Sequence, residues 1–304
     1  MMKVKFWGVR GSTPCPGPDT VRTGGNTSCI ELRYGNENEL IIIDAGSGIR
    51  LLGNHLLKTG TCPKKIRIFL THTHSDHIMG LPYFTPIYIP GYKIDIYGPV
   101  TYEEEGLEKI ISDQFSYRYF PVKHSELSAD ISYHNLQQTK LELEGLSVST
   151  HYLNHPILTL GYRFESNGRI VTTVYDTEPF SNLFPEDPED PDYDEFTAHE
   201  GRLAAEEANE EISGFLAGSD ILIHDSQYTQ EELTRSFRGW GHSSFEGTVK
   251  TAGEQGVKKL FFFHHAMDRS DNELEALLDK HKKTAEQYSG LEVDIAREGY
   301  TEEI

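Results

Sequence analysis

The sequence predicts an α/β protein in which β-sheets are covered on their outer sides by helices. Strand-like runs separated by Gly and Asn turns open the chain, and a β-rich centre follows. Helical patterns then alternate with short apolar strands towards the C-terminus. This order of elements is typical of layered folds with helices packed against sheets.

Strands are predicted where β-branched and aromatic residues form short runs between turn residues. These runs are Val4–Val9, Ser28–Tyr34, Leu40–Asp44, Ile66–Leu70, Ile94–Tyr97, Leu146–Tyr152, Thr159–Glu165, Arg169–Tyr175, Ile221–His224 and Lys259–Phe263. Asn167-Gly168 predicts a hairpin turn, because both residues adopt positive φ readily. Helices are predicted at Ile49–Leu57, Glu103–Gln114, Glu200–Leu216, Ser244–Gln255 and Asp271–Ser289.

The chain is expected to form one domain over residues 1–304, because layered folds of this length often keep a single core. An acidic stretch broken by prolines, Phe184 to Glu195, predicts a solvated loop insertion near residues 182–199. A lid over the functional site is the alternative interpretation of this loop.

The composition limits the classes of partner. The net charge is −20, from 28 basic and 48 acidic residues, so stable binding of nucleic acid is not expected. A small phosphate ester remains compatible, because the charge of a bound metal acts locally. The three cysteines form no C-x-x-C pair, no apolar run is long enough to span a membrane, and no signal peptide is recognisable. We therefore expect a cytoplasmic location without membrane attachment.

A cluster of potential metal ligands directly follows the predicted strand Ile66–Leu70. The segment Thr71 to Gly80 contains His72, His74, Asp76 and His77 within six residues. Neutral imidazole and carboxylate are the ligands that first-row divalent metals take, and a strand delivers its carboxyl end to a crevice where ligands bind. The cluster therefore predicts a metal site.

Three further candidates stand at strand ends elsewhere in the chain. They are His155, Asp176 and His264. A single His or Asp in such a position is more often a hydrogen-bonding turn residue than a ligand. Two divalent ions, however, need about three more ligands than the cluster provides, and these residues would supply them.

The H-x-H-x-D-H motif of His72 to His77, together with Asp44, His155, Asp176 and a late His, resembles the metallo-β-lactamase-fold hydrolase superfamily. The resemblance covers nearly the whole chain. It implies an αβ/βα four-layer sandwich, two mixed β-sheets face to face with helices outside, and a dinuclear metal site at one edge.

The resemblance also implies a role for each landmark. The first ion would be held by His72, His74 and His155, the second by Asp76, His77 and His264, and Asp176 would bridge them. His265 is the alternative to His264, because neighbouring side chains in a strand point to opposite faces. Asp44 is expected to orient a ligating imidazole.

Looser motifs favour one branch of the superfamily. Gly8 to Ser12, Gly24 to Cys29 and the Gly241-His242-Ser243-Ser244 turn resemble the branch that contains ribonuclease Z and small phosphodiesterases. A metal-bridging hydroxide would then attack phosphorus in line, and the leaving alkoxide would need a proton. His242 is the candidate donor, with a helix-capping turn as its alternative role. Asp76 is expected both to ligate and to accept the proton of the nucleophile.

The favoured function is therefore a dinuclear metal-dependent phosphodiesterase that cleaves a small nucleotide or sugar phosphodiester, cyclic ones included. A ribonuclease Z-like nuclease acting on transfer-RNA precursors is the alternative enzyme, although the sequence contains no basic, Gly-rich arm. A non-catalytic metal-binding sensor is the alternative of another class. Zinc is the favoured metal, with manganese or iron as alternatives, and the resemblance implies a homodimer.

Overall fold

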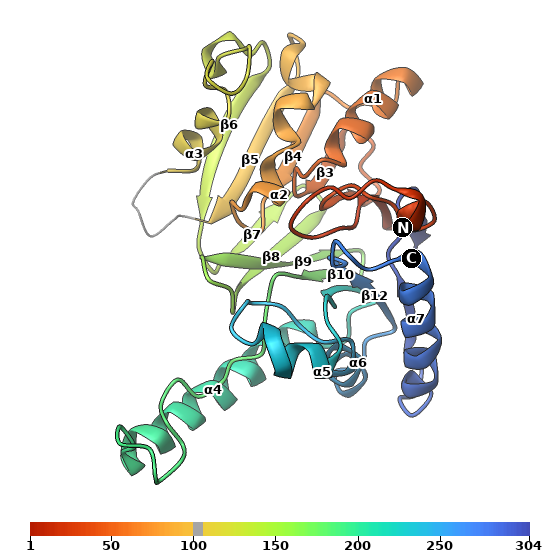
Figure 1. The fold of residues 1–304 in the computed structure, drawn as a ribbon. Coiled ribbons are helices and arrows are strands. Elements are labelled where there is room, and N and C mark those ends of the chain that lie inside the picture. The colour runs from red at the N-terminus through yellow and green to blue at the C-terminus, as the bar shows by residue number, and fades with distance from the viewer. Residues whose placement is uncertain (100–105) are drawn as a thin grey trace.

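Two mixed β-sheets of seven strands each pack face to face in the computed structural model, which describes residues 1–99 and 106–304 (Figure 1). The first sheet has the order β14-β1-β2-β3-β4-β5-β6. Its strands are β1 (Lys3–Gly8), β2 (Cys29–Arg33), β3 (Glu39–Ile43), β4 (Lys65–Phe69), β5 (Lys93–Pro99), β6 (Asp130–Leu136) and β14 (Thr301–Glu303). Strands β3 to β6 run parallel to one another, and β14, β1, β2 and β3 are antiparallel neighbours.

The second sheet has the order β13-β12-β11-β10-β9-β8-β7. Its strands are β7 (Lys140–Leu143), β8 (Leu146–Leu153), β9 (Thr159–Ser166), β10 (Arg169–Val174), β11 (Ile221–Asp225), β12 (Lys259–Phe263) and β13 (Glu292–Ile295). Strands β10 to β13 are parallel, whereas β7 to β10 form an antiparallel meander. Each sheet therefore brings several strand carboxyl ends to one edge.

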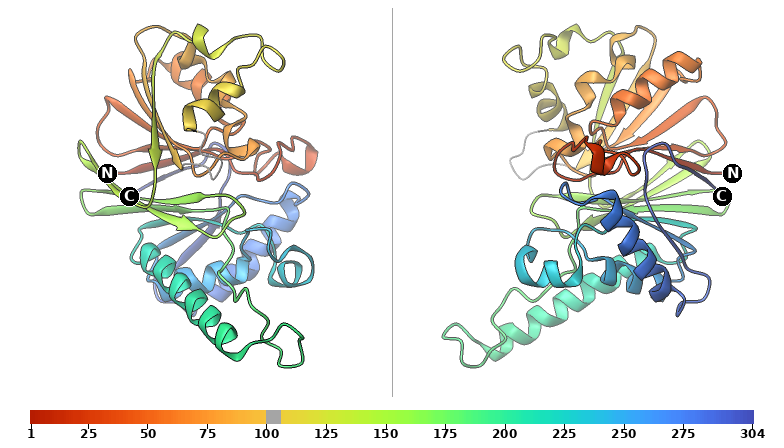
Figure 2. Two further views of the ribbon diagram at one scale, coloured as in Figure 1. Left: turned by 90° about the vertical axis from the view of Figure 1, so that its left-hand side faces the viewer. Right: turned by 45° about the vertical axis from the view of Figure 1, so that its right-hand side comes forward.

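Helices cover the outer face of each sheet, as Figures 1 and 2 show. The helices are α1 (Ile49–Thr59), α2 (Ser75–Ile78), α3 (Leu107–Asp113), α4 (Glu195–Leu216), α5 (Gln230–Glu232), α6 (Phe245–Glu254) and α7 (Asp271–Ala285). Helices α1 and α3 pack on the first sheet, and α4, α6 and α7 pack on the second. None of the helices in the described residues combines the length and apolar character that a membrane crossing requires.

The alternation of side chains along β3 shows why the strand is apolar throughout. Ile41 and Ile43 point into the core between the two sheets, whereas Leu40 and Ile42 point into the core beneath α1 and α3. A strand that is covered on both faces reads as a continuous apolar run rather than an alternating one. The prediction of an αβ/βα sandwich is confirmed by this layer order.

Several predicted boundaries differ from the structure. Strands β6, β7, β13 and β14 were not predicted, because their sequences are polar or very short. The predicted helix at 103–114 is observed as α3 from Leu107, and residues 103–105 lie outside the described part.

The predicted C-terminal boundary of the loop near 182–199 is wrong. Helix α4 begins at Glu195, because the side chain of Asp194 accepts a hydrogen bond from the Thr197 amide at 2.9 Å and caps the helix. Figures 1 and 2 show the acidic stretch at the far end of α4, which projects away from both sheets. This position does not support the interpretation of the stretch as a lid.

A buried carboxylate at the start of β3 makes the stability sensitive to acid. Glu39 accepts hydrogen bonds from the Tyr34 hydroxyl at 2.7 Å and from Arg67 at 3.2 Å, and it contacts Lys65. Burial alone would raise the pKa of Glu39, but hydrogen bonds from these three residues lower it to about 2, from 4.5. A lowered pKa stabilises the fold above pH 4.5, and this contribution is lost as the pH falls towards 2.

We therefore expect Glu39→Gln to remove up to about 3 kcal/mol of the pH dependence of the unfolding free energy between pH 5 and 2. Urea denaturation at a series of pH values measures this difference between the two proteins. Parallel pH profiles for wild type and variant would contradict the assignment.

Candidate metal centre

The four side chains of the first predicted ligand group converge at the edge between the two sheets. His72 and His74 follow β4, and the ring atoms His72 Nε2 and His74 Nδ1 lie 2.9 Å apart. His155, which follows β8, places Nε2 at 3.1 Å from His74 Nδ1. Oδ2 of Asp176, after β10, lies 3.5 Å from His72 Nε2 and 3.8 Å from His155 Nε2.

The second predicted group lies beside the first and shares Asp176 with it. Asp76 and His77 belong to α2, and Asp76 Oδ2 lies 3.2 Å from His77 Nε2. His264, directly after β12, places Nε2 at 3.2 Å from Asp76 Oδ2 and at 3.1 Å from Asp176 Oδ1. The ligand atoms of each group lie within 4.8 Å of one another.

The spacing of the ligand atoms and their lack of hydrogen-bond partners fit bound divalent ions. His77 Nε2 and Asp176 Oδ1 are buried and have no hydrogen-bond partner within the described residues. Metal–ligand bonds of about 2.0–2.1 Å in a tetrahedron separate ligand atoms by roughly 3.3–3.4 Å, close to the separations of 2.9 to 3.8 Å seen here. The two predicted groups therefore provide candidate ion sites joined by Asp176, and a third, overlapping group consists of Asp176, His264, Asp225 and His242.

The protonation states of His72, His155 and Asp176 suit metal binding, whereas nearby carboxylates raise the pKa of His77, so an ion that binds there displaces a proton. Burial lowers the pKa of His72 well below its ordinary value, and it lowers the pKa of His155 to about 4. Burial would raise the pKa of Asp176, but His264 and His77 outweigh it and lower the pKa strongly. Neutral imidazoles and an ionised carboxylate are the forms that bind a cation.

Backbone strain marks the points where three strands deliver their functional residues. Asp44 and His264 directly follow β3 and β12, Asp176 lies two residues after the end of β10, and each has a positive φ, of 59°, 57° and 56° respectively. The left-handed region is unfavourable for residues with a Cβ and persists where the surrounding structure imposes it. The turn lets each chain reverse direction immediately at the end of its strand.

His264, and not His265, reaches the ligand cluster. The His265 ring places Nε2 at 3.0 Å from the Ala296 carbonyl, to which it can only donate. The backbone amide of His265 also donates to the Val9 carbonyl at 3.0 Å. His265 is absent from both ligand groups, so the alternative assignment to His265 is not supported.

Asp44 lies behind His77 rather than among the ligand atoms. Its Oδ2 is 2.7 Å from His77 Nδ1, and Oδ1 accepts the Thr71 amide at 2.7 Å. The Thr71 hydroxyl also donates to Oδ2 at 2.9 Å. This arrangement fixes the proton of His77 on Nδ1 and leaves Nε2 free to ligate.

We expect Asp44→Asn to weaken metal binding about 10- to 100-fold, because the amide holds the His77 ring less firmly. Competition with a chromophoric chelator measures the affinity of each ion. Asp95→Asn, on β5 and outside both ligand groups, is the matched control. Equal affinities in wild type and Asp44→Asn would show that the carboxylate does not support the site.

Asp225, to which no role was assigned from the sequence, pairs with His242. Oδ2 of Asp225 lies 2.7 Å from His242 Nδ1, and both side chains are buried. Burial lowers the pKa of His242, but the Asp225 charge and hydrogen bond outweigh it and raise the pKa to about 9. Asp225 ends the apolar strand β11, a position equivalent to that of the other site acids, and this was the available signal.

A contact from the N-terminal loop to the second ligand group was also not predicted from the sequence. The Ser12 amide donates to Asp76 Oδ2 at 2.7 Å, and a Cβ at Gly11 would lie only 2.4 Å from the His264 ring. The loop therefore packs directly against two residues of the second ligand group. The contact joins residues 64 positions apart, which no local pattern reveals.

Two face-to-face mixed sheets with His and Asp ligand groups at their common edge define a metallohydrolase architecture. The sequence profile of the metallo-beta-lactamase superfamily matches residues 22–162. The whole chain has the metallo-beta-lactamase fold, and the match to the sequence profile covers just under half of it.

Similarity to known proteins extends over nearly the whole chain. Ribonuclease Z of Lactobacillus gasseri is 26% identical, and the match covers 97% of this chain and 99% of that protein. The metallo-beta-lactamase fold protein YhfI of Bacillus subtilis has a TM-score of 0.65 at 17% identity, covering 99% of this chain and 98% of its own. A diphosphatase of the PhnP family has a TM-score of 0.62 at 19% identity, covering 100% and 98%.

Proposed function

We propose that the protein is a dinuclear metal-dependent phosphodiesterase that acts on a small nucleotide or sugar phosphodiester. The observation that carries the proposal is the pair of ligand groups joined by Asp176, with the His242–Asp225 pair beside it. The His242 ring stacks on His264 with centroids 5.2 Å apart. A proton donor thus stands directly next to the second ion site.

Two divalent ions held by these groups would supply acidified water and neutralise phosphoryl charge. Asp76 accepts the proton of the attacking water through the carboxylate that Ser12 holds in place. His242 donates a proton to the leaving alkoxide, and Asp225 keeps the His242 proton donor oriented. The two proton-transfer groups therefore belong to different elements, α2 and the turn before α6.

The charge of the molecule favours a small substrate over a transfer-RNA precursor. The net charge is −20, and the projecting segment at α4 carries acidic residues such as Glu186, Asp190 and Glu207. A polyanion would be repelled from these surfaces, whereas a small diester meets mainly the field of the bound ions.

Ribonuclease Z-like processing is the second candidate, because a curated relative of near-equal length bears that name. A gel-shift titration with transfer RNA at low salt discriminates the two proposals. Tight binding with a steep salt dependence would favour the nuclease, and its absence favours the small-substrate enzyme.

We expect the metal-loaded protein to hydrolyse bis(p-nitrophenyl) phosphate steadily, and this activity to vanish on chelation and in Asp76→Ala. Chelation removes the ions, and the variant removes both a ligand and the proton acceptor. Release of p-nitrophenolate is followed by absorbance. Asp187→Ala, in the acidic segment away from the ligand groups, is the control. A metal-loaded protein inert towards every phosphodiester would overturn the proposal and favour a non-catalytic sensor.

A further inference from the structure

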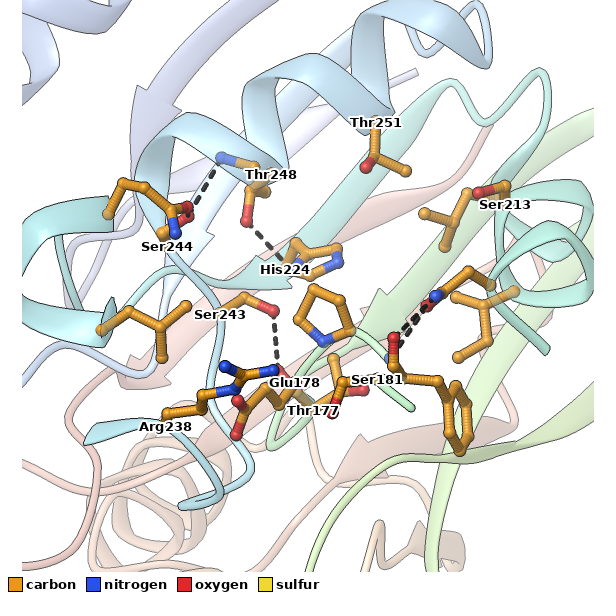
Figure 3. Close-up of a pocket in the computed structure, with 18 of the residues that line it drawn as sticks. Thr177, Glu178, Ser181, Ser213, His224, Arg238, Ser243, Ser244, Thr248 and Thr251 are labelled. Carbon is orange, nitrogen blue, oxygen red and sulfur yellow. Dashed lines mark hydrogen bonds between the residues drawn. The ribbon is translucent and has the colours of Figure 1, made fainter. Parts of the chain in front are cut away.

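A separate cavity lies behind the segment that carries His242. It has a volume of 440 Å³ and is bounded by α4, α6, the end of β11 and the turn after β10 (Figure 3). Ser243 and Thr177 line it, but none of the predicted metal ligands and not His242. The cavity thus shares a wall with the metal centre without being part of it, and its volume is within the range of small-molecule sites.

His224 presents an unused hydrogen-bond acceptor to this cavity. The ring is only 6% exposed, and Figure 3 shows it amid the residues that line the cavity. Nδ1 lies 2.8 Å from the Asp225 carbonyl, which only accepts, so Nδ1 carries the proton. Nε2 of the neutral ring has no hydrogen-bond partner among the described residues. A ligand or a water molecule in the cavity can therefore donate a hydrogen bond to Nε2.

The remaining walls divide into a hydroxyl-bearing part and an apolar part. The hydroxyls of Ser181, Ser213 and Thr251 line the cavity and have no partner in the described residues. The apolar part is formed by Phe180, Ile212, Leu216 and Leu233. An apolar ring and a polyol would each find a complementary surface here.

A positive charge without an acidic partner lies at the rim. Arg238 lines the cavity and makes no ion pair within the described chain. The neighbouring Glu178 carboxylate already accepts the amides of Gly239 at 2.7 Å and Gly241 at 3.1 Å. Glu178 therefore holds the backbone of the loop, and the Arg238 guanidinium is available to an anion.

We propose that this cavity binds a nucleoside monophosphate as an effector distinct from the substrate. The base packs on the apolar wall, ribose hydroxyls bind His224 Nε2 and the hydroxyl-bearing wall, and the phosphate binds Arg238. The Ser243 hydroxyl donates to the Thr177 carbonyl at 2.6 Å, which links the chain after His242 to the chain after Asp176. A ligand packed against both residues restrains that link and hence the position of His242.

Isothermal titration of the metal-free protein with adenosine monophosphate tests the site without relying on turnover. We expect one saturable site, with adenosine and ribose 5-phosphate each binding at least about tenfold more weakly, since each lacks one group of contacts. Arg238→Ala should reduce the affinity for adenosine monophosphate to that for adenosine. Arg235→Ala, an exposed arginine of the same segment that does not line the cavity, should leave it unchanged.

Ser213 lines the cavity from α4, so Ser213→Phe should fill it and abolish binding while leaving hydrolysis of bis(p-nitrophenyl) phosphate intact. The inference is overturned if the metal-free protein fails to bind adenosine monophosphate, or binds it equally after Ser213→Phe or Arg238→Ala. Because binding is measured without metal, its failure is distinguishable from a failure of the phosphodiesterase proposal.

Discussion

Asp176→Ala is expected to abolish phosphodiester hydrolysis, with kcat/KM falling by about 10⁴-fold or more, because both ion sites lose a ligand at once. Asp176 contributes Oδ2 beside His72 and Oδ1 beside His264, at 3.5 and 3.1 Å. No other side chain belongs to both the first and the second group. Metal analysis of the purified variant should find fewer than two ions per chain.

The control for Asp176→Ala must separate loss of ligands from loss of fold. Asp220→Ala removes another buried carboxylate, one that binds Lys258 and Arg169 at the opposite end of β11. It should lower stability while preserving metal content and activity per folded molecule. Full metal occupancy in Asp176→Ala would show that the carboxylate does not join the two sites.

The ligand cluster was predictable because its residues lie close together in the sequence or next to the ends of recognisable strands. The cluster from His72 to His77 begins three residues after the end of a buried strand, and Asp176 and His264 lie within two residues of a strand end. Parallel strands bring their carboxyl ends to one edge, so sequence-distant residues at such ends meet in space. The structure shows this convergence for all seven predicted ligands.

The supporting residues were not predictable because their contacts depend on tertiary register. The Asp225–His242 pair spans 17 positions and joins a strand end to a turn. The choice between His264 and His265 was also open, because both follow β12. Positive φ at His264 turns its ring towards the cluster, and this backbone conformation has no signature in a Phe-Phe-Phe-His-His sequence.

The edge strands β6 and β14 were not predicted for a different reason. Strand β6 has the sequence DISYHNL and β14 has only three residues, so neither displays an apolar run. Both lie at the edges of the first sheet, where one side of the strand is unpaired and sequence demands are weaker. The core strands β3, β4 and β12, buried on both faces, were predicted to within one residue at each end.

His242→Ala is expected to slow hydrolysis by an amount that depends on the leaving group. An alkoxide, as in a cyclic 3′,5′-nucleotide, needs a proton as it departs, so kcat should fall about 10²- to 10⁴-fold. Bis(p-nitrophenyl) phosphate releases a stable phenolate, so its hydrolysis should be affected far less. Steady-state kinetics on both substrates measure the difference, with His199→Ala, on exposed α4, as the control. Equal losses on both substrates would instead indicate a structural role for His242.

Asp225→Asn then tests the same proton donor through pH. Asp225 raises the pKa of His242 to about 9, so the donor remains protonated at neutral pH, and activity falls only as the pH rises through that pKa. Bound divalent ions would lower the absolute value, but removing the carboxylate lowers it further in either case. The alkaline limb of kcat should therefore move to lower pH in Asp225→Asn for the alkoxide-releasing substrate. In His242→Ala the alkaline limb should disappear. If Asp225 only positioned the backbone, neither variant would change this limb.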